Sequence, residues 1–302
     1  MKRTRSLGRF LLIALLLAGA LPASAATLDR VRETGQIRLG YIDGARPFSY
    51  RDESGNAAGY AVALCQSVAR AVKEELKLPQ LKTEYVLLGA DERFDALQQG
   101  RVDVLCAGGA ATVSRREQAS LSIPIFVGGI AALIHDDAPA SLRAKLEERP
   151  EPRQAHWRAS LGQVLRDRTY VVVRGTTTVE WLAGRISALG IPAKTETVDG
   201  FGAGVERIAD GSADVFFADR ALLLDAAMRS PHAGDLVLLE RRFSYESIGL
   251  ALPRGDEDFR LLVDRLLSGL YRSGQIDAVY SPYFGKLDSQ TLHFLQAVSL
   301  SD

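Results

Sequence analysis

Two segments of this sequence carry residue types and spacings that can hold a small charged ligand. In the first, a strand-like segment ends at Cys106 and is followed by small residues at 107–111. Small side chains let a ligand approach the backbone, and Arg115 can grip a carboxylate through two parallel hydrogen bonds. The structural alternative is a glycine-rich loop in which Ser114 and Glu117 form a capping box and Arg115 is solvated.

The second segment lies about 60 residues further along the chain. Thr176 and Thr177 stand at the start of a predicted helix, where backbone amides favour an anion. Ordinary capping by threonine is the alternative. Asp219 follows a buried strand at 215–217, so its carboxylate can serve as the counterion of a buried ammonium; it could equally pair with Arg220 or cap the next helix.

Several catalytic chemistries lack their sequence motifs. The four histidines are far apart, and the chain contains no H-E-x-x-H, C-x-x-C, G-x-S-x-G or Walker A motif. The glycines at 200–204 precede a helix, but their spacing departs from the dinucleotide-binding pattern. The sequence therefore predicts no metal site, no cofactor and no catalysed reaction.

Alternating strands and helices must position the candidate residues. In the first half, hydrophobic spacing predicts strand 36–40, helix 61–76, strand 84–88, helix 91–99 and strand 102–106. In the second half it predicts strand 170–173, helix 179–189, strand 194–198, helix 205–209 and strand 215–217. This alternation is typical of an α/β fold with mostly parallel sheets, whose ligands bind at the carboxyl ends of strands.

Two such units are expected, because residues 97–104 and 208–215 share a Gly-x-x-Asp motif in the same setting. The charged segment 138–168 between them is interpreted as a solvated helical excursion. Amphipathic helices at 258–268 and 275–280 need a sheet face to cover. If the chain returns to the first unit from about Glu246, it crosses between the units twice and forms a hinge.

Charge and targeting signals narrow the class of protein. The 302 residues carry 37 basic and 37 acidic side chains, a balance that predicts no nucleic-acid partner. Residues 1–25 combine a basic head, an apolar run at 10–20 and small residues before Ala26, as cleaved secretory signals do. We expect cleavage near Ala25 and a mature protein in the periplasm.

Cys65 and Cys106 are the two cysteines of the chain, too few for a disulfide framework. We interpret them as buried free thiols on a helix and at a strand end, because cysteine is among the most buried residue types. Pairing in an oxidising compartment is the alternative.

Taken in order, these motifs resemble a known family. The matching positions are Leu28–Arg30, Pro47–Tyr50, Gly59, Tyr60, Gly100, Asp103, Thr112, Arg115, Phe126, Gly175–Thr177, Gly211, Asp214 and Asp219. The chain resembles the periplasmic amino-acid-binding proteins of ABC importers, solute-binding protein family 3, and is most similar to the glutamate/aspartate-binding branch. The resemblance covers nearly the whole mature chain.

The resemblance implies a two-lobed type II periplasmic-binding fold with a two-strand hinge. After the signal peptide at 1–25, lobe 1 would comprise residues 27–127 and 246–302, and lobe 2 residues 128–245. The cleft between the lobes would hold the ligand, and closure of the lobes would complete its binding.

The resemblance also implies roles for single residues. Arg115, helped by Thr177, would bind the ligand's α-carboxylate, while Asp219 and the backbone around Gly108 and Ala110 would bind its α-ammonium. Thr112 and Thr176 belong to the same predicted set.

Two departures concern the ligand's side chain. Where the glutamate/aspartate branch has an arginine and a histidine for the side-chain carboxylate, this chain has Ile42 and Phe201. We therefore expect a less acidic ligand, unless the long side chain of Arg46 reaches the cleft.

The function implied is a monomeric periplasmic receptor that captures a small amino acid or related zwitterion and delivers it to an ABC permease in the inner membrane. Two alternatives stay open: a periplasmic prephenate or arogenate dehydratase on the same fold, and a ligand sensor for a membrane kinase. The dehydratase is disfavoured because its chemistry needs a poised acid, and Asp219 is the one acid that the sequence places in the pocket.

Overall fold

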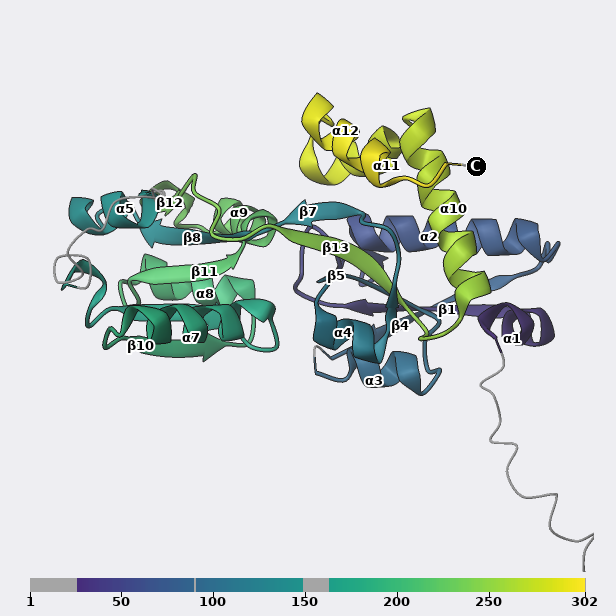
Figure 1. Ribbon diagram of the computed structural model, residues 1–302, viewed down its shortest axis with the longest axis horizontal. Helices are drawn as coiled ribbons and strands as arrows, with labels where there is room; N and C mark the ends of the chain where they lie inside the picture. The colour runs from purple at the N-terminus through teal and green to yellow at the C-terminus, as the bar shows by residue number, and fades with distance from the viewer. Residues whose placement is uncertain (1–25, 90, 149–162, 302) are drawn as a thin grey trace, which may run out of the picture.

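A computed structural model describes residues 26–89, 91–148 and 163–301. The expected signal peptide at 1–25 lies outside these ranges. The chain forms two lobes side by side, joined where β7, β8 and β13 run between them (Figure 1). Within the described residues, no helix combines the length and apolar character needed to cross a membrane.

Lobe 1 is built on a six-stranded sheet. Its strands, in spatial order, are β4 (Lys82–Leu88), β1 (Gln36–Ile42), β5 (Val104–Ala110), β13 (Glu246–Leu252) and β6 (Ser120–Leu121), and β7 (Phe126–Gly128) also pairs with β13. β1 runs parallel to β4 and β5, whereas β13 runs antiparallel to β5. The short hairpin β2 (Tyr50–Arg51) and β3 (Ala57–Ala58) follows β1. The parallel strands β1, β4 and β5 thus end at one edge of the sheet.

Helices cover both faces of this sheet because side chains along a strand alternate between faces. On β5, Val104 and Cys106 join the larger core, while Leu105 and Ala107 join a smaller one. The larger core is covered by α1 (Thr27–Thr34), α2 (Tyr60–Glu75), α10 (Glu257–Ser273), α11 (Ile276–Phe284) and α12 (Ser289–Val298). The smaller core is covered by α3 (Arg93–Gln98), and α4 (Val113–Gln118) follows β5.

Lobe 2 repeats this plan with five strands. Their order is β10 (Lys194–Val198), β9 (Thr169–Val173), β11 (Val215–Asp219), β8 (Ile130–His135) and β12 (Leu236–Leu238), the last preceded by the turn η1 (Ala233–Asp235). One face is covered by α8 (Phe201–Ala209) and α9 (Arg220–Arg229). The other is covered by α5 (Ala140–Glu147) and α7 (Thr177–Leu189).

Three sequence expectations need correction here. β5 does not end at Cys106 but continues to Ala110, because its last residues pair with β13. α8 begins at Phe201 rather than at 205. The excursion at 138–168 is not simply solvated, because α5 buries Leu142 and Leu146 against the lobe 2 sheet. Residues 149–162 of this segment lie outside the described ranges.

The repeated Gly-x-x-Asp motif has the same structural task in each lobe. The Asp103 carboxylate accepts a hydrogen bond from the backbone N–H of Arg38 at 2.7 Å, and the Asp103 N–H donates back to the Arg38 carbonyl. Asp214 makes the equivalent pair of bonds with Thr169. Each aspartate therefore locks the start of its lobe's first parallel strand, and burial raises the pKa of Asp103.

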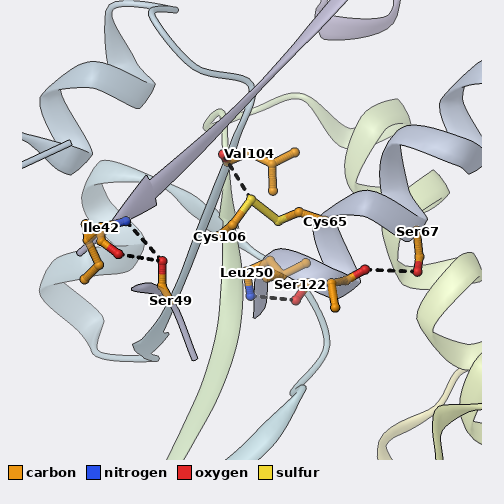
Figure 2. The surroundings of a disulfide bond; sticks show 9 residues. Ile42, Ser49, Cys65, Ser67, Val104, Cys106, Ser122 and Leu250 are labelled. Carbon is orange, nitrogen blue, oxygen red and sulfur yellow. Dashed lines mark hydrogen bonds between the residues drawn. A yellow bond between two sulfur atoms is a disulfide. The ribbon is translucent and has the colours of Figure 1, made fainter. Parts of the chain in front are cut away.

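The cysteines form a disulfide, so the interpretation as free thiols is wrong. Cys65 on α2 and Cys106 on β5 are bonded, with Cα atoms 6.0 Å apart (Figure 2). Both are fully buried, as expected, but the sequence could not show that α2 packs over β5 and brings the two sulfurs together. The bond ties the helix to the strand that leads into the cleft between the lobes.

The lobes are joined by two chain crossings that lie against each other. The first leads from β7 through Gly129 into β8, and the second returns through Ser244 into β13. The Ile130 N–H donates to the Ser244 hydroxyl at 3.1 Å, and a side chain at Gly129 would overlap the Ser244 carbonyl oxygen. We propose lobe boundaries at 127/128 and 245/246. The membership of each strand in its sheet supports them except at Gly128, which is the last residue of β7 and pairs with Glu246 in the lobe 1 sheet.

Candidate functional site

A cleft lies between the lobes at the carboxyl ends of the parallel strands. Eight of the ten predicted ligand-binding residues line it: Ile42, Gly108, Ala110, Arg115, Thr176, Thr177, Phe201 and Asp219. Thr112 and Arg46 do not. The structure therefore brings together most of the predicted set, although its role in ligand binding stays a prediction.

Arg115 is positioned by the start of α4. The Thr112 hydroxyl caps this helix by accepting the Arg115 N–H at 3.2 Å, so the cap is Thr112 and not Ser114, which the capping-box alternative proposed. The Arg115 Nη1 donates to the Ala110 carbonyl at 2.9 Å, which aims the guanidinium at the end of β5. Burial lowers the pKa of Arg115, and Glu246 and Glu180 oppose that shift. Thr112 thus positions Arg115 by capping α4, and its own side chain lines a neighbouring cavity.

Backbone geometry at the end of β5 keeps this wall of the cleft open. Gly108 has a left-handed φ of +65°, which favours glycine, and a side chain there would press against the ring of Phe48. A side chain at Gly109 would stand 3.6 Å from the Arg115 guanidinium. On the neighbouring strand β1, the last residue is Ile42. The Ser49 hydroxyl accepts the Ile42 N–H and donates to the Ile42 carbonyl, which fixes the end of β1 (Figure 2).

Asp219 lies at the opposite, lobe 2 side of the cleft. One carboxylate oxygen accepts the Ala221 N–H at 2.9 Å and caps α9, and the other accepts the Gly129 N–H at 2.7 Å. Burial raises its pKa, while these backbone donors oppose the shift. Of the two structural alternatives, helix capping by Asp219 is therefore correct. Arg220, the other partner considered for Asp219, instead donates to the Leu239 carbonyl. With Leu222 counted as a third backbone donor, the Asp219 carboxylate still has a lone pair for a ligand ammonium.

The two threonines of lobe 2 stand at the N-terminus of α7. The Thr176 hydroxyl donates to the Val173 carbonyl at 2.7 Å and makes no side-chain cap. The Thr177 hydroxyl donates to a carboxylate oxygen of Glu246 at 3.2 Å. Thr176, Thr177 and Thr178, at the start of α7, all line the cleft, where helix N-terminal amides favour an anion.

Sequence reasoning missed several residues of the cleft, of which Arg93, Phe94 and Glu246 bear most directly on a ligand. The charged residues Asp43, Arg174 and Asp199 also line it. The guanidinium carbons of Arg93 and Arg115 lie 5.4 and 5.7 Å from the centre of the Phe94 ring. Burial, with the neighbouring Arg115 charge, lowers the pKa of Arg93 to about 10. The available signal was that α3 follows β4, whose carboxyl end lies beside that of β1.

Arg93 overturns the argument that an acidic side chain would meet no cation in the cleft. That argument rested on Ile42 and Phe201 and left Arg46 as the possible rescue. Arg46 instead forms an ion pair with Asp225 of lobe 2 at 3.2 Å, and its guanidinium lies 4.4 Å from the Tyr50 ring centre. Arg46 is a link between the lobes outside the cleft.

Replacing Arg46 by alanine should weaken ligand binding by only about 2- to 5-fold, since half-exposed ion pairs contribute little. The loss should appear as faster ligand dissociation, because the ion pair joins two lobes that must separate for release. Stopped-flow fluorescence measures this rate, with exposed Arg51→Ala as the matched control. A loss above about 100-fold would place Arg46 in the binding site after all.

A cleft between two hinged α/β lobes, with opposite charges on its two walls, is typical of solute-binding proteins. The comparisons with known proteins give the family. Residues 37–286 match the bacterial extracellular solute-binding proteins, family 3, and the chain belongs to this family. The resemblance stated from the sequence is confirmed.

Individual relatives agree with this family assignment. The chain is 28% identical over 259 residues to the L-glutamate/L-aspartate-binding protein of Pseudomonas aeruginosa, covering 85% of this chain and 80% of the relative. It is 30% identical to a glutamate/glutamine/aspartate/asparagine-binding protein of Rhodobacter capsulatus, covering 86% of this chain and 70% of the relative. The solved structure of AncCDT-1, an ancestral amino acid-binding protein described as a precursor of cyclohexadienyl dehydratase, has a TM-score of 0.67 at 24% identity, over 86% of this chain and all of that one. This last likeness confirms the type II fold.

Proposed function

We propose that this protein is a periplasmic receptor that binds one amino acid in its cleft and delivers it to an ABC permease in the inner membrane. The observation that carries the proposal is the placement of Arg115 and Asp219 on opposite walls of one cleft. The names of the relatives, which bind glutamate, aspartate and their amides, support the same ligand class.

Each charged end of an amino acid meets a suitable partner in this cleft. Arg115 offers a planar set of N–H donors to the α-carboxylate, and Thr177 and the α7 amides lie across from it. Asp219 offers its remaining lone pairs to the α-ammonium. Because the two groups come from different lobes, one ligand would bridge them and hold the lobes closed.

The ligand's side chain would be recognised by Arg93. Its guanidinium lies beside Phe94 and offers donors to an oxygen acceptor, which a carboxamide or a carboxylate provides. The Arg93 Nη2 already donates to the Gly175 carbonyl at 3.4 Å, and an aliphatic ligand side chain would leave the remaining donors of this partly buried guanidinium without a partner, which is costly. We therefore propose an amino acid with an oxygen-bearing side chain, of the asparagine, glutamine, aspartate or glutamate type.

A thermal-shift screen of residues 26–302, freed of ligand by unfolding and refolding, tests the proposal. A ligand at about 100 times its dissociation constant adds about 2.7 kcal/mol of stability. We expect one of the four named amino acids to raise the melting temperature most. Analogues that lack the α-carboxylate or the α-amino group serve as controls and should have little effect. Absence of a shift with all twenty amino acids would contradict the proposal.

An enzymatic function needs a second test, because the structure changes one premise of the sequence argument. Glu246 joins Asp219 in the cleft, so Asp219 is not the sole acid there. However, the Glu246 carboxylate accepts a hydrogen bond from the Thr177 hydroxyl at 3.2 Å, so one of its oxygens is already engaged within the protein. Incubation with prephenate or arogenate should yield no aromatic product. Turnover that survives purification and disappears in Asp219→Asn would favour the dehydratase.

A further inference from the structure

The first crossing between the lobes is made by two consecutive glycines, Gly128 and Gly129. Gly128 is the last residue of β7, and it pairs with Glu246 of β13 in the lobe 1 sheet. The carbonyl of Gly129 accepts the Arg220 N–H of lobe 2 at 2.9 Å. Both glycines are buried, and neither belongs to the residues that line the cleft. They therefore carry the chain from one lobe to the other while standing outside the cleft itself.

The space beside Gly128 is taken by the carboxylate of Asp219. A Cβ atom at position 128 would lie 2.3 Å from Asp219 Oδ2 and 2.7 Å from Ile248 Cδ1. Both separations are far shorter than van der Waals contact, so a side chain at this position would have to displace one neighbour or both. The backbone of Gly128 is not left-handed, in contrast to that of Gly108. Position 128 therefore requires glycine for the space it leaves and not for its conformational freedom.

Backbone donors hold both oxygens of Asp219 and oppose its displacement. Oδ2, the atom that meets position 128, accepts the Gly129 N–H at 2.7 Å, and Oδ1 accepts the Ala221 N–H at 2.9 Å. Moving Oδ2 away from a side chain at position 128 would strain the bond to Gly129, because this donor belongs to the very next residue. Ile248 differs, since its Cδ1 is the end of a flexible side chain that can change rotamer. The conflict at position 128 is therefore chiefly with Asp219.

We propose that Gly128 is a positioning residue for ligand binding, because its missing side chain lets the Asp219 carboxylate lie against the first crossing, where it meets the ligand's α-ammonium. The inference rests on the proposed function, in which Asp219 binds that ammonium. Gly128 acts through Asp219, since it does not itself line the cleft. The ligand and the Gly129 N–H would thus share one carboxylate, which couples binding to the segment about which the lobes move.

The experiment pairs each of the four amino acids of the proposed class with the compound that lacks its α-amino group, such as glutamate with glutarate. Isothermal titration calorimetry compares the wild-type protein with Gly128→Ala. The affinity for the preferred amino acid should fall by about 10-fold or more, because a displaced Asp219 no longer pairs fully with the α-ammonium. The affinity for the matching compound without an amino group should change by less than about 3-fold.

Gly249→Ala is the matched control. It adds the same methyl group to a buried position of β13 in the lobe 1 sheet, where the Cβ atom would lie 3.2 Å from the Ser122 carbonyl oxygen. This variant should bind both compounds within about 3-fold of the wild type. Ile248→Val removes the Cδ1 atom, and adding Gly128→Ala to it should still cause the loss, since the conflict with Asp219 remains.

A double-mutant cycle with Asp219→Ala tests the inference through stability as well. Gly128→Ala should lower the melting temperature by less than about half as much when residue 219 is already alanine, because the displaced carboxylate is then absent. If Gly128→Ala alone does not fold by circular dichroism, the double variant should fold. Equal losses for the amino acid and its counterpart without an amino group, or equal changes in melting temperature in both backgrounds, would overturn the role of Gly128 and leave the receptor intact. A wild-type protein that binds none of the four amino acids would overturn the proposed function as well.

Discussion

Replacing Arg115 by alanine should weaken binding of the preferred amino acid by about 2 to 5 kcal/mol, because the α-carboxylate would then be buried without its cation. The effect should be large because the Arg115 guanidinium is fixed by the Ala110 carbonyl and by the Thr112 cap on α4. Isothermal titration calorimetry at constant pH and salt measures the loss.

The neighbouring Arg116 provides a matched control, since it is the next residue of the same helix and is exposed. Arg116→Ala should bind within about 2-fold of the wild type. Arg115→Lys should recover part of the loss, because lysine keeps the charge but not the paired donors. Unchanged affinity in Arg115→Ala would refute the assignment of this residue.

Removing the disulfide by replacing Cys65 and Cys106 with alanine should lower the free energy of unfolding by about 2 to 5 kcal/mol. The bond closes a chain segment with a separation of 41 residues, and it thereby restricts the unfolded chain. Urea unfolding followed by circular dichroism measures the change.

Reductant is the control for this prediction. It should destabilise the wild-type protein by a similar amount and leave the alanine variant unaffected. Two titratable thiols in unfolded protein that was purified without reductant would contradict the disulfide.

Local patterns predicted most of the elements because each pattern reports a local cause. The alternation at 36–40 and the helical spacing of α2 follow from which faces are buried, and Gly190 ends α7 where the backbone turns left-handed. The rule that ligands bind at the carboxyl ends of parallel strands made Arg115 and Asp219 candidates, and the family resemblance then assigned their roles, which stay predictions.

The missed features depend on tertiary neighbours that have no local signal. Glu246 reads as an ordinary strand residue, and it enters the cleft because the second crossing lies against the first. The Cys65–Cys106 bond depends on the packing of α2 over β5. The position of the Arg46 side chain could not be predicted from its length alone, because its ion-pair partner, Asp225, belongs to the other lobe.

A crystal structure of the protein with the amino acid selected by the screen tests the central claim most directly. We expect the α-carboxylate to lie within hydrogen-bond distance of the Arg115 guanidinium, and the α-ammonium within hydrogen-bond distance of the Asp219 carboxylate, with the lobes closed around both. A ligand bound outside this cleft, or one whose charged ends contact neither Arg115 nor Asp219, would contradict the account.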